Sequence, residues 1–220
     1  MAGESIKQTE QGDLQDQAGR ALGPRAQTTR RTLLDSTAEL LAQQSLRDVR
    51  VVDIARRVGS SPATFYQYFK DVEDAVLQLA EEASLEMPAI LELIEDPWVE
   101  VDGMQRARAI VDAFIRHWDK HHAILRVRNL ASDEGDGRFA AVRARAMSPL
   151  LDTLAKHIDS AKSAGRLSES LNARAGAAAL AAILERLAAY HRELENIGVS
   201  LEDLVESSAY ILYRNITGYN

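Results

Sequence analysis

The segment GSSPATFYQYF, residues 59–69, holds the side chains whose types and spacing are best suited to binding another molecule. Four aromatic rings occupy its last five positions, although aromatic residues make up only 5% of the chain. On a helix that turns about 100° per residue, Phe65 and Phe69 fall on one face and predict a buried side. The opposite face and its borders carry small or hydrogen-bonding residues, namely Ala63, Thr64, Tyr66, Gln67 and Tyr68.

The face opposite the two phenylalanines suits direct contact with DNA bases. Thr64 and Gln67 can hydrogen-bond base edges in a major groove, where glutamine pairs well with adenine. Ala63 is small enough to permit close approach. We therefore predict that this face enters the major groove.

The flanking residues suit the DNA backbone instead. Tyr66 and Tyr68 each combine an apolar ring with a hydroxyl, and both are placed to contact phosphates on the groove walls. Ser61 is a candidate helix cap, with Pro62 at the first helical position, where its missing N–H costs nothing. The amino end of such a helix also favours a phosphate.

The element before this helix completes a helix-turn-helix pattern. A short helix is predicted over 51–58, and Gly59 stands where a left-handed residue ends such a helix. Small Ala55, Gly59 four residues later and apolar Phe65 have the spacing that locks two helices together. The pattern also fits a plain helical hairpin with a tyrosine-rich surface.

Charge is distributed unevenly along the chain. The net charge is −7, yet residues 20–70 carry nine basic and four acidic residues, a surplus of +5. A basic block on an acidic chain indicates a polyanionic partner.

Composition excludes several other classes of protein. The chain of 220 residues has no cysteine, which excludes disulfides and thiolate metal sites. No apolar run approaches the roughly 18–20 residues that span a membrane. We expect a cytoplasmic protein without membrane contact, because the amino terminus also lacks the pattern of a signal peptide.

Almost every segment after residue 28 has helical periodicity, so the predicted class is all-α, with about nine helices. Residues 1–24 are polar and are expected to form a disordered tail. Pro88 should end or kink the fourth helix, and Pro149 should kink a later one near Ser148. The helix bounds expected after the helix-turn-helix are 97–121, 137–164, 172–194 and 200–216, with the first helix at 29–44.

The stretch VVDIARRVGSSPATFYQYFKDVEDAV resembles the DNA-binding domain of the TetR family of bacterial transcriptional repressors. The resemblance covers about residues 28–75. The family pattern is matched at Ile54, Ala55, Gly59, Ser61, Thr64, Tyr66, Tyr68 and Phe69.

The chain departs from the family pattern in the residues that often contact phosphates. Arg50 stands where the family often has threonine, and Val72 where it often has lysine. Arg50 and Lys70 are therefore our candidates to replace a lost phosphate contact. Arg30, just before or within the first helix, is a candidate for a basic arm along the DNA, although a solvated arm without DNA contact fits equally well.

The resemblance implies a repressor that binds a palindromic operator in double-stranded DNA as a homodimer. It divides the chain into the tail at 1–24, a helix-turn-helix domain at 25–71, and a ligand-binding and dimerisation domain at 72–220. Ligand binding in the last domain would release the operator through the fourth helix.

Apolar residues of the C-terminal part cluster at helical spacing beside Pro149, which predicts a cavity for a small lipophilic effector. Most of them would be core. The candidate lining residues are Phe114, Trp118, Leu125, Asn129, Met147, Leu151, Leu187 and Tyr190. The last two helices, rich in small residues, are expected to form the dimer interface, although tight packing within one chain would use the same residues.

No constellation for catalysis, cofactor binding or metal binding stands out. His117 and His121 are four residues apart, but we interpret them as a surface pair and predict no metal and no cofactor. A helical binding protein without operator function, and a helical enzyme acting on lipids, remain as alternatives to the repressor. Because no paired catalytic groups are apparent, we predict that the protein is not an enzyme.

Overall fold

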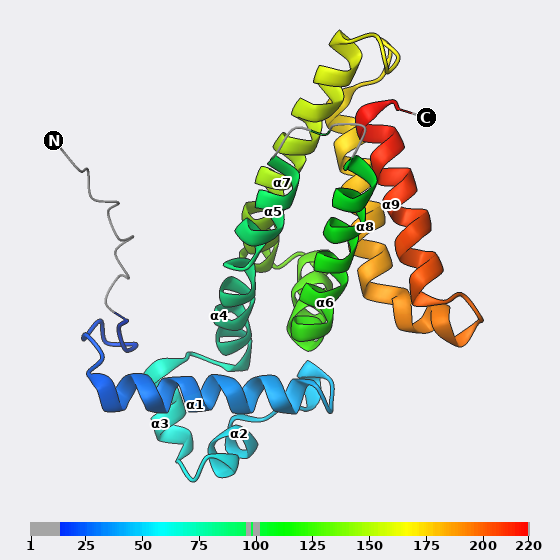
Figure 1. Cartoon of the computed structure of the whole chain (residues 1–220). Helices are drawn as coiled ribbons and strands as arrows, with labels where there is room; N and C mark the ends of the chain where they lie inside the picture. Colours follow the sequence, from blue (N-terminus) through cyan, green and yellow to red (C-terminus); the bar gives the residue numbers. More distant parts are fainter. Residues whose placement is uncertain (1–13, 96–97, 99–101, 220) are drawn as a thin grey trace, which may run out of the picture. The chain divides into compact units, whose positions relative to one another are not determined.

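The computed structural model describes residues 14–95, 98 and 102–219, and these form helices joined by short loops (Figure 1). The helices are α1 (Pro24–Leu41), α2 (Val51–Arg57), α3 (Pro62–Tyr68), α4 (Val72–Ser84), α5 (Met87–Glu95), α6 (Gly103–Asp133), α7 (Gly137–Ser163), α8 (Ala173–Asn196) and α9 (Leu201–Thr217), with a short 3-10 helix at Leu46–Asp48. No named strand occurs in the described parts of the chain, which confirms the all-α class. None of the described helices is long and apolar enough to cross a membrane.

The chain divides into two compact units, with the boundary in the sequence between Leu79 and Ala80. The expected boundary at residues 71 and 72 lies eight residues earlier, at the start of α4. The difference arises because the first turns of α4 belong to the core of the first unit, where Ala75 and Val76 are fully buried.

In the first unit, α1, α2 and α3 pack against one another (Figure 1). Helix α1 begins at Pro24, five residues before the predicted start, with the proline in its first turn. Its buried stripe is Arg30, Leu33, Leu34, Thr37 and Leu41, at the spacing of one helix face. The expected start at residue 29 was too late because the first turns of α1 are polar, so that no periodic pattern of apolar residues marks them as helical.

The turn between α2 and α3 follows the sequence prediction. Gly59 has a positive φ of 66°, a conformation that glycine adopts without a steric penalty. The Ser60 amide donates to the Ala55 carbonyl at 2.9 Å and the Gly59 amide to the Arg56 carbonyl at 3.1 Å. This pair of hydrogen bonds is the Schellman motif, which satisfies the last carbonyls of α2.

Residues 14–23 form a compact turn, where a disordered tail was expected; the rest of that predicted tail, residues 1–13, lies outside the described residues. Gln15 and Ala21 make an isolated antiparallel bridge. Gln17 donates its backbone amide to the Gln67 carbonyl at 2.9 Å and its side-chain amide to the Tyr68 carbonyl at 3.1 Å. The tail prediction was wrong here because polar residues can order a segment by hydrogen bonding without any apolar periodicity.

In the second unit, α5 to α9 enclose one apolar core. Helix α6 contacts α5, α7, α8 and α9, and α7 lies along α8 (Figure 1). The fully buried side chains include Ile94, Ile110, Leu154 and Ile158. Pro88 falls in the first turn of α5, after α4 has ended at Ser84, as the sequence predicted.

Helix α6 differs from its expected bounds, whereas α7 matches its expected span of 137–164 to within one residue. Helix α6 continues to Asp133 instead of ending near His121, because Ala123, Ile124 and Val127 extend its buried face. The expected start of this helix at residues 96–97 lies outside the described residues. Helix α7 includes Pro149 within its span.

Candidate DNA-binding and effector sites

Helix α3, the predicted recognition helix, is fixed at its amino end by a side-chain cap. The Ser61 hydroxyl oxygen accepts from the Thr64 amide at 3.2 Å, and the Ser61 and Thr64 hydroxyls lie 3.0 Å apart. Pro62 follows the cap at the first helical position. Such a cap stabilises a helix by about 1 kcal/mol, a useful contribution for a helix of only seven residues.

Burial along α3 matches the face predicted from the sequence. Phe65 and Phe69 are fully buried, with ring centroids 5.2 Å apart. Tyr66 is 53% exposed and packs one edge of its ring on Phe65. The remaining positions are outward or partly so: Ser61, Pro62, Ala63 and Gln67 are exposed, while Thr64 and Tyr68 are half-buried.

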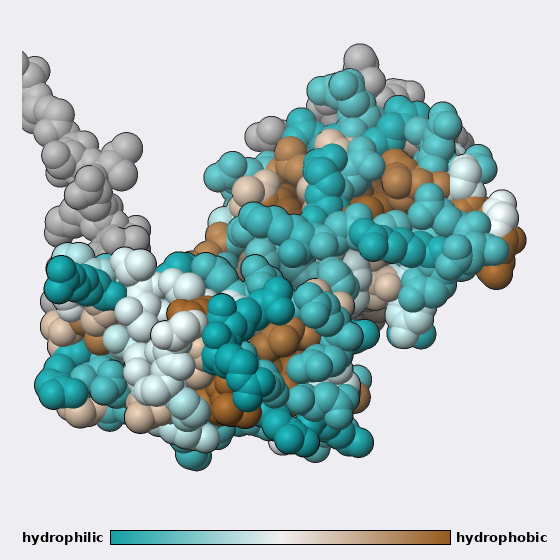
Figure 2. Space-filling view, turned by 90° about the horizontal axis from the view of Figure 1, so that it is seen from below, coloured by the Kyte–Doolittle hydropathy of each residue, from teal (hydrophilic) through white to brown (hydrophobic). Residues whose placement is uncertain are grey.

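Two candidate cations lie on the surface of the first unit. Arg50 is exposed at the residue before α2, and Lys70 is exposed in the turn after α3. The Lys70 backbone amide donates to the Asp74 carboxylate at 3.0 Å, which anchors that turn. Figure 2, a view from below, shows hydrophilic residues interspersed with residues of intermediate hydropathy and some hydrophobic ones.

Arg30 does not lie on that surface, so its assignment to a DNA-contacting arm was wrong. It is 9% exposed, donates to the Gln78 side-chain oxygen at 2.8 Å and lies over the Phe69 ring, 5.3 Å from its centroid. Residue 30 precedes Leu33 and Leu34 by three and four positions, which places it on the buried stripe of α1. Its cation is held there by π-electron and amide groups.

The predicted effector residues of the second unit fall into two neighbouring sites. Phe114, Leu125 and Met147 line a small cavity of ≈ 20 Å³ between α5, α6, α7 and α8. Asn129, Leu187 and Tyr190 line an open groove of ≈ 1100 Å³ along α6 and α8. Trp118 lines both sites.

Two further features bear on the prediction of a cavity. Leu151 lines neither of these sites and packs against the apolar core. Pro149 lines a separate cavity of ≈ 100 Å³ together with Met87, Ala146 and Leu150. The structure thus places space near Pro149, as expected, but separates it from the Trp118 sites.

A charge cluster around the buried Arg128, which the sequence analysis missed, borders the small cavity. Arg128 is 5% exposed; burial lowers its pKa to about 10 although Glu185 opposes the shift. Glu185 pairs with Arg128 at 3.7 Å and with Arg143. Arg128 also donates to the Asn129 side-chain oxygen at 2.9 Å, so that this amide already has a partner inside the protein.

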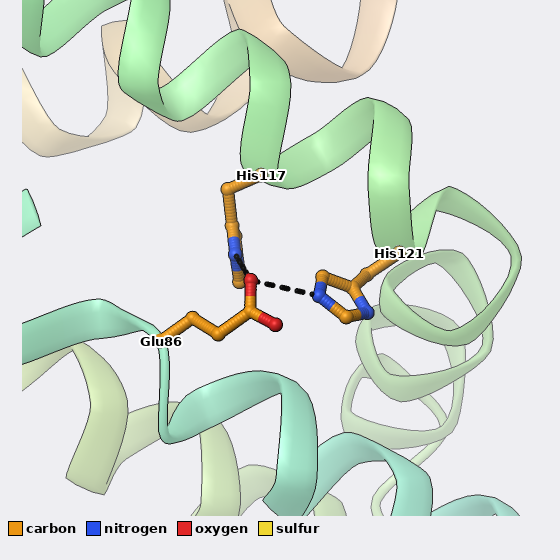
Figure 3. Close-up of side chains that lie close together, drawn as sticks. All are labelled: Glu86, His117 and His121. Carbon is orange, nitrogen blue, oxygen red and sulfur yellow. Dashed lines mark ion pairs between the residues drawn. The ribbon is translucent and has the colours of Figure 1, made fainter. Parts of the chain in front are cut away.

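His117 and His121 are not a surface pair, contrary to the sequence interpretation. Their side chains are 9% and 19% exposed, and both rings face Glu86, in the turn before α5 (Figure 3). Burial and the neighbouring His121 lower the pKa of His117 to about 4, despite Glu86. Burial raises the pKa of Glu86, but the nearby Lys120 and His121 outweigh it and lower the pKa to about 2.

Known protein families match a segment in each of the two units. A family described as "Bacterial regulatory proteins, tetR family" matches residues 33–79, and one described as "Tetracyclin repressor-like, C-terminal domain" matches residues 90–220. A curated relative from Haemophilus influenzae, an uncharacterized HTH-type transcriptional regulator, is 26% identical over 132 residues. That alignment covers 59% of this chain and spans 63% of the relative.

Solved structures share the fold at low sequence identity. FadR of Bacillus subtilis, a transcriptional regulator solved in complex with stearoyl-CoA, has a TM-score of 0.62 and 17% identity, covering 86% of this chain and 99% of FadR. GusR of Salmonella enterica has a TM-score of 0.60 and 16% identity, covering 86% of this chain and 95% of GusR.

The matched families are families of transcriptional regulators, which supports the prediction that the chain is not an enzyme. The helix-turn-helix lies in the segment that the first family covers, and the second family alone covers more than half of the chain. The chain therefore belongs to the TetR family of bacterial transcriptional regulators.

Proposed function

We propose that the protein is a ligand-responsive repressor that binds a palindromic operator as a homodimer and is released by a small lipophilic effector. The observation that carries the proposal is the outward face of α3. A capped helix presents Ala63 and Gln67 to solvent and keeps Thr64 partly exposed, while its buried face is fixed by two phenylalanines. A rigid helix with a small and hydrogen-bonding face is what major-groove recognition requires.

The proposed DNA contacts divide by chemistry. Thr64 and Gln67 contact base edges, with Ala63 allowing close approach. Residues that face the groove walls or lie at the amino ends of helices contact phosphates. Such contacts fix the position of the protein along the DNA without reading its sequence. The residues proposed for these phosphate contacts are Arg50, Ser61, Tyr66, Tyr68 and Lys70. Pro62, which has no N–H to donate, is proposed to lie against the DNA backbone beside Ser61.

The proposed dimer interface lies on the outer faces of α8 and α9. These faces expose large apolar side chains, with exposed fractions of 41% for Ile183, 53% for Tyr210 and 40% for Ile211. Ala178 and Ala182, also exposed on α8, leave room for the close approach of a second helix. Large apolar side chains exposed on the same two helices favour a protein interface there.

The proposed effector site joins the cavity and the groove at Trp118. A cavity of ≈ 20 Å³ holds about one water molecule, so it must widen to admit an organic ligand. A second subunit packed on α8 would cover the groove and turn it into an enclosed site. A long acyl chain fits this arrangement, and a relative of the same fold was solved with stearoyl-CoA.

Operator binding tests the proposal directly. The full-length protein should shift DNA from the region upstream of its own gene at concentrations that leave a scrambled duplex of equal length unbound. Affinity should fall steeply as salt rises, because phosphate contacts release counterions. Equal affinity for both duplexes would contradict an operator-specific repressor and favour a binding protein that lacks operator function.

A further inference from the structure

Three side chains of the second unit converge on one point with a donor set that is typical of transition-metal sites. His117 and His121 lie four residues apart on α6, so both rings project from one face of the helix. Glu86 approaches from the turn between α4 and α5 (Figure 3). One donor atom of each residue lies within 4.8 Å of the others.

The distances are close to those of a tetrahedral site. The Glu86 Oε2 atom lies 3.0 Å from His121 Nε2 and 3.7 Å from His117 Nδ1. Ligand atoms bound to Zn²⁺ at about 2.0–2.1 Å in tetrahedral geometry stand about 3.3 Å apart. Small side-chain rotations therefore suffice to bring all three donors onto one ion.

Two imidazole nitrogens approach the Glu86 carboxylate as ion-pair partners but have no hydrogen-bond partner among the described residues. His117 Nδ1 and His121 Nε2 are buried, and neither makes a hydrogen bond of acceptable geometry among the described residues. Unsatisfied buried nitrogen atoms are rare in folded proteins and require an explanation. A bound cation would satisfy both lone pairs at once.

One oxygen atom of the Glu86 carboxylate remains available to bind a metal ion, because the other oxygen is paired with Lys120. Lys120 Nζ pairs with Glu86 Oε1 at 2.6 Å, whereas Oε2 faces the two imidazoles. A partner on the outer oxygen orients a metal-ligating carboxylate. Glu86 is also 39% exposed, which gives an ion a path from solvent.

We propose that Glu86, His117 and His121 bind a divalent transition-metal ion, and that Zn²⁺ is the ion that the donor set suits best. Imidazole nitrogen and carboxylate oxygen are common zinc ligands, and three protein ligands leave one position for water. This site goes beyond the proposed operator and effector functions and needs neither of them.

The test is a zinc titration of the tag-free, full-length protein after removal of metals by dialysis against a chelator. In competition with a chromophoric chelator, the wild type should bind one Zn²⁺ per chain. Glu86→Gln and His121→Gln should each weaken binding at least about tenfold, since even outer-shell substitutions cost about 10–100-fold. His122→Gln, at the exposed neighbouring histidine, should leave affinity unchanged.

Two results would overturn the metal site. One is wild-type affinity no greater than that of the Glu86→Gln variant; the other is an equal loss in the His122→Gln control. Melting curves without metal show that each variant is folded before affinities are compared. Cobalt substitution gives a second readout, because a tetrahedral site intensifies the visible absorption of Co²⁺. The absorption bands of the wild type should be lost in Glu86→Gln.

Discussion

Gln67 and Tyr66 are neighbours on α3, yet they have different proposed roles in binding DNA. Gln67→Ala should lower the discrimination between operator and scrambled DNA by about 1–3 kcal/mol, because a base contact carries sequence information. Tyr66→Phe should weaken binding to both duplexes about equally, because only a phosphate contact is lost. Mobility-shift titrations of both variants on both duplexes measure this difference. An equal loss on the two duplexes for Gln67→Ala would exclude base readout at residue 67.

Arg30 has a structural role in the first unit. Arg30→Ala removes the hydrogen bond to Gln78 and the contact with the Phe69 ring, so it should lower the free energy of unfolding by about 1.5–3 kcal/mol. Urea unfolding measures the loss. Arg25→Ala, at an exposed position of the same helix, should change stability by less than about 0.5 kcal/mol. Reduced DNA affinity at unchanged stability would restore the interpretation of Arg30 as part of an arm.

At the scale of elements, α8 supplies the face on which the dimer is proposed to form. Ala182→Arg should give monomers, because dimer formation would bury an unpaired charge against the second subunit. Since Ala182 is exposed in one chain, the substitution should leave the fold intact. Sedimentation at micromolar concentration measures the assembly state. Ala89→Arg, at an exposed position of α5, is the matched control and should remain dimeric. A monomeric wild type would rule out the dimer.

Helices α5 and α7 are joined by a hydrogen bond that should depend on pH. His157 Nε2 lies 2.6 Å from the Ile94 carbonyl oxygen near the end of α5, and the same oxygen accepts from Trp98 Nε1. Burial lowers the pKa of His157 below its ordinary value of 6.5, outweighing that hydrogen bond, and Arg106 and Lys156 act in the same direction.

Because the folded protein disfavours protonated His157, the unfolded chain takes up more protons just below that ordinary value. Stability should therefore fall as pH decreases through about 6.5. His157→Gln, which cannot titrate but can still donate to the Ile94 carbonyl, should reduce this slope. Thermal melting between about pH 5.5 and 7.5 measures it. A slope that is the same in wild type and variant would exclude His157 as a source, and His122→Gln is the exposed control.

The sequence predicted the helices best where a local signal marks their ends. Ser61 lies at the cap position that the sequence predicted, and Asn172 and Ser200, the expected first residues of α8 and α9, cap those helices, because a cap depends only on residues within one turn. Contacts between distant residues left no such signal. Glu86 meets histidines more than thirty residues later, and Arg30 meets Gln78 48 residues away. Both encounters depend on how whole helices pack.

At the scale of the whole molecule, effector binding is proposed to weaken operator binding. A ligand at Trp118 should raise thermal stability by mass action, by ~2.7 kcal/mol at a hundredfold excess over Kd. It should also lower operator affinity by ~1–3 kcal/mol, a usual coupling energy, provided that it prefers the DNA-incompetent state.

A panel of fatty acids, sterols and lipophilic drugs tests this coupling, scored by melting temperature and by operator affinity. Quenching of tryptophan fluorescence reports occupancy, and Trp118→Phe, which leaves Trp98 as the other tryptophan, is the control that removes the Trp118 contribution. Compounds that raise the melting temperature while operator affinity stays constant would show a binding site without a switch.

The hydrogen bonds from Gln17 to the Gln67 and Tyr68 carbonyls have a consequence for how operator specificity can be transferred. Helix α3 has only seven residues, and its last carbonyls are satisfied by a segment that precedes α1 and lies outside the family match at 33–79. Grafting residues 61–69 onto another regulator would carry over the side chains proposed to contact bases but leave behind the donor that closes the end of the helix. A faithful exchange of specificity must therefore move residues 14–22 together with the recognition helix.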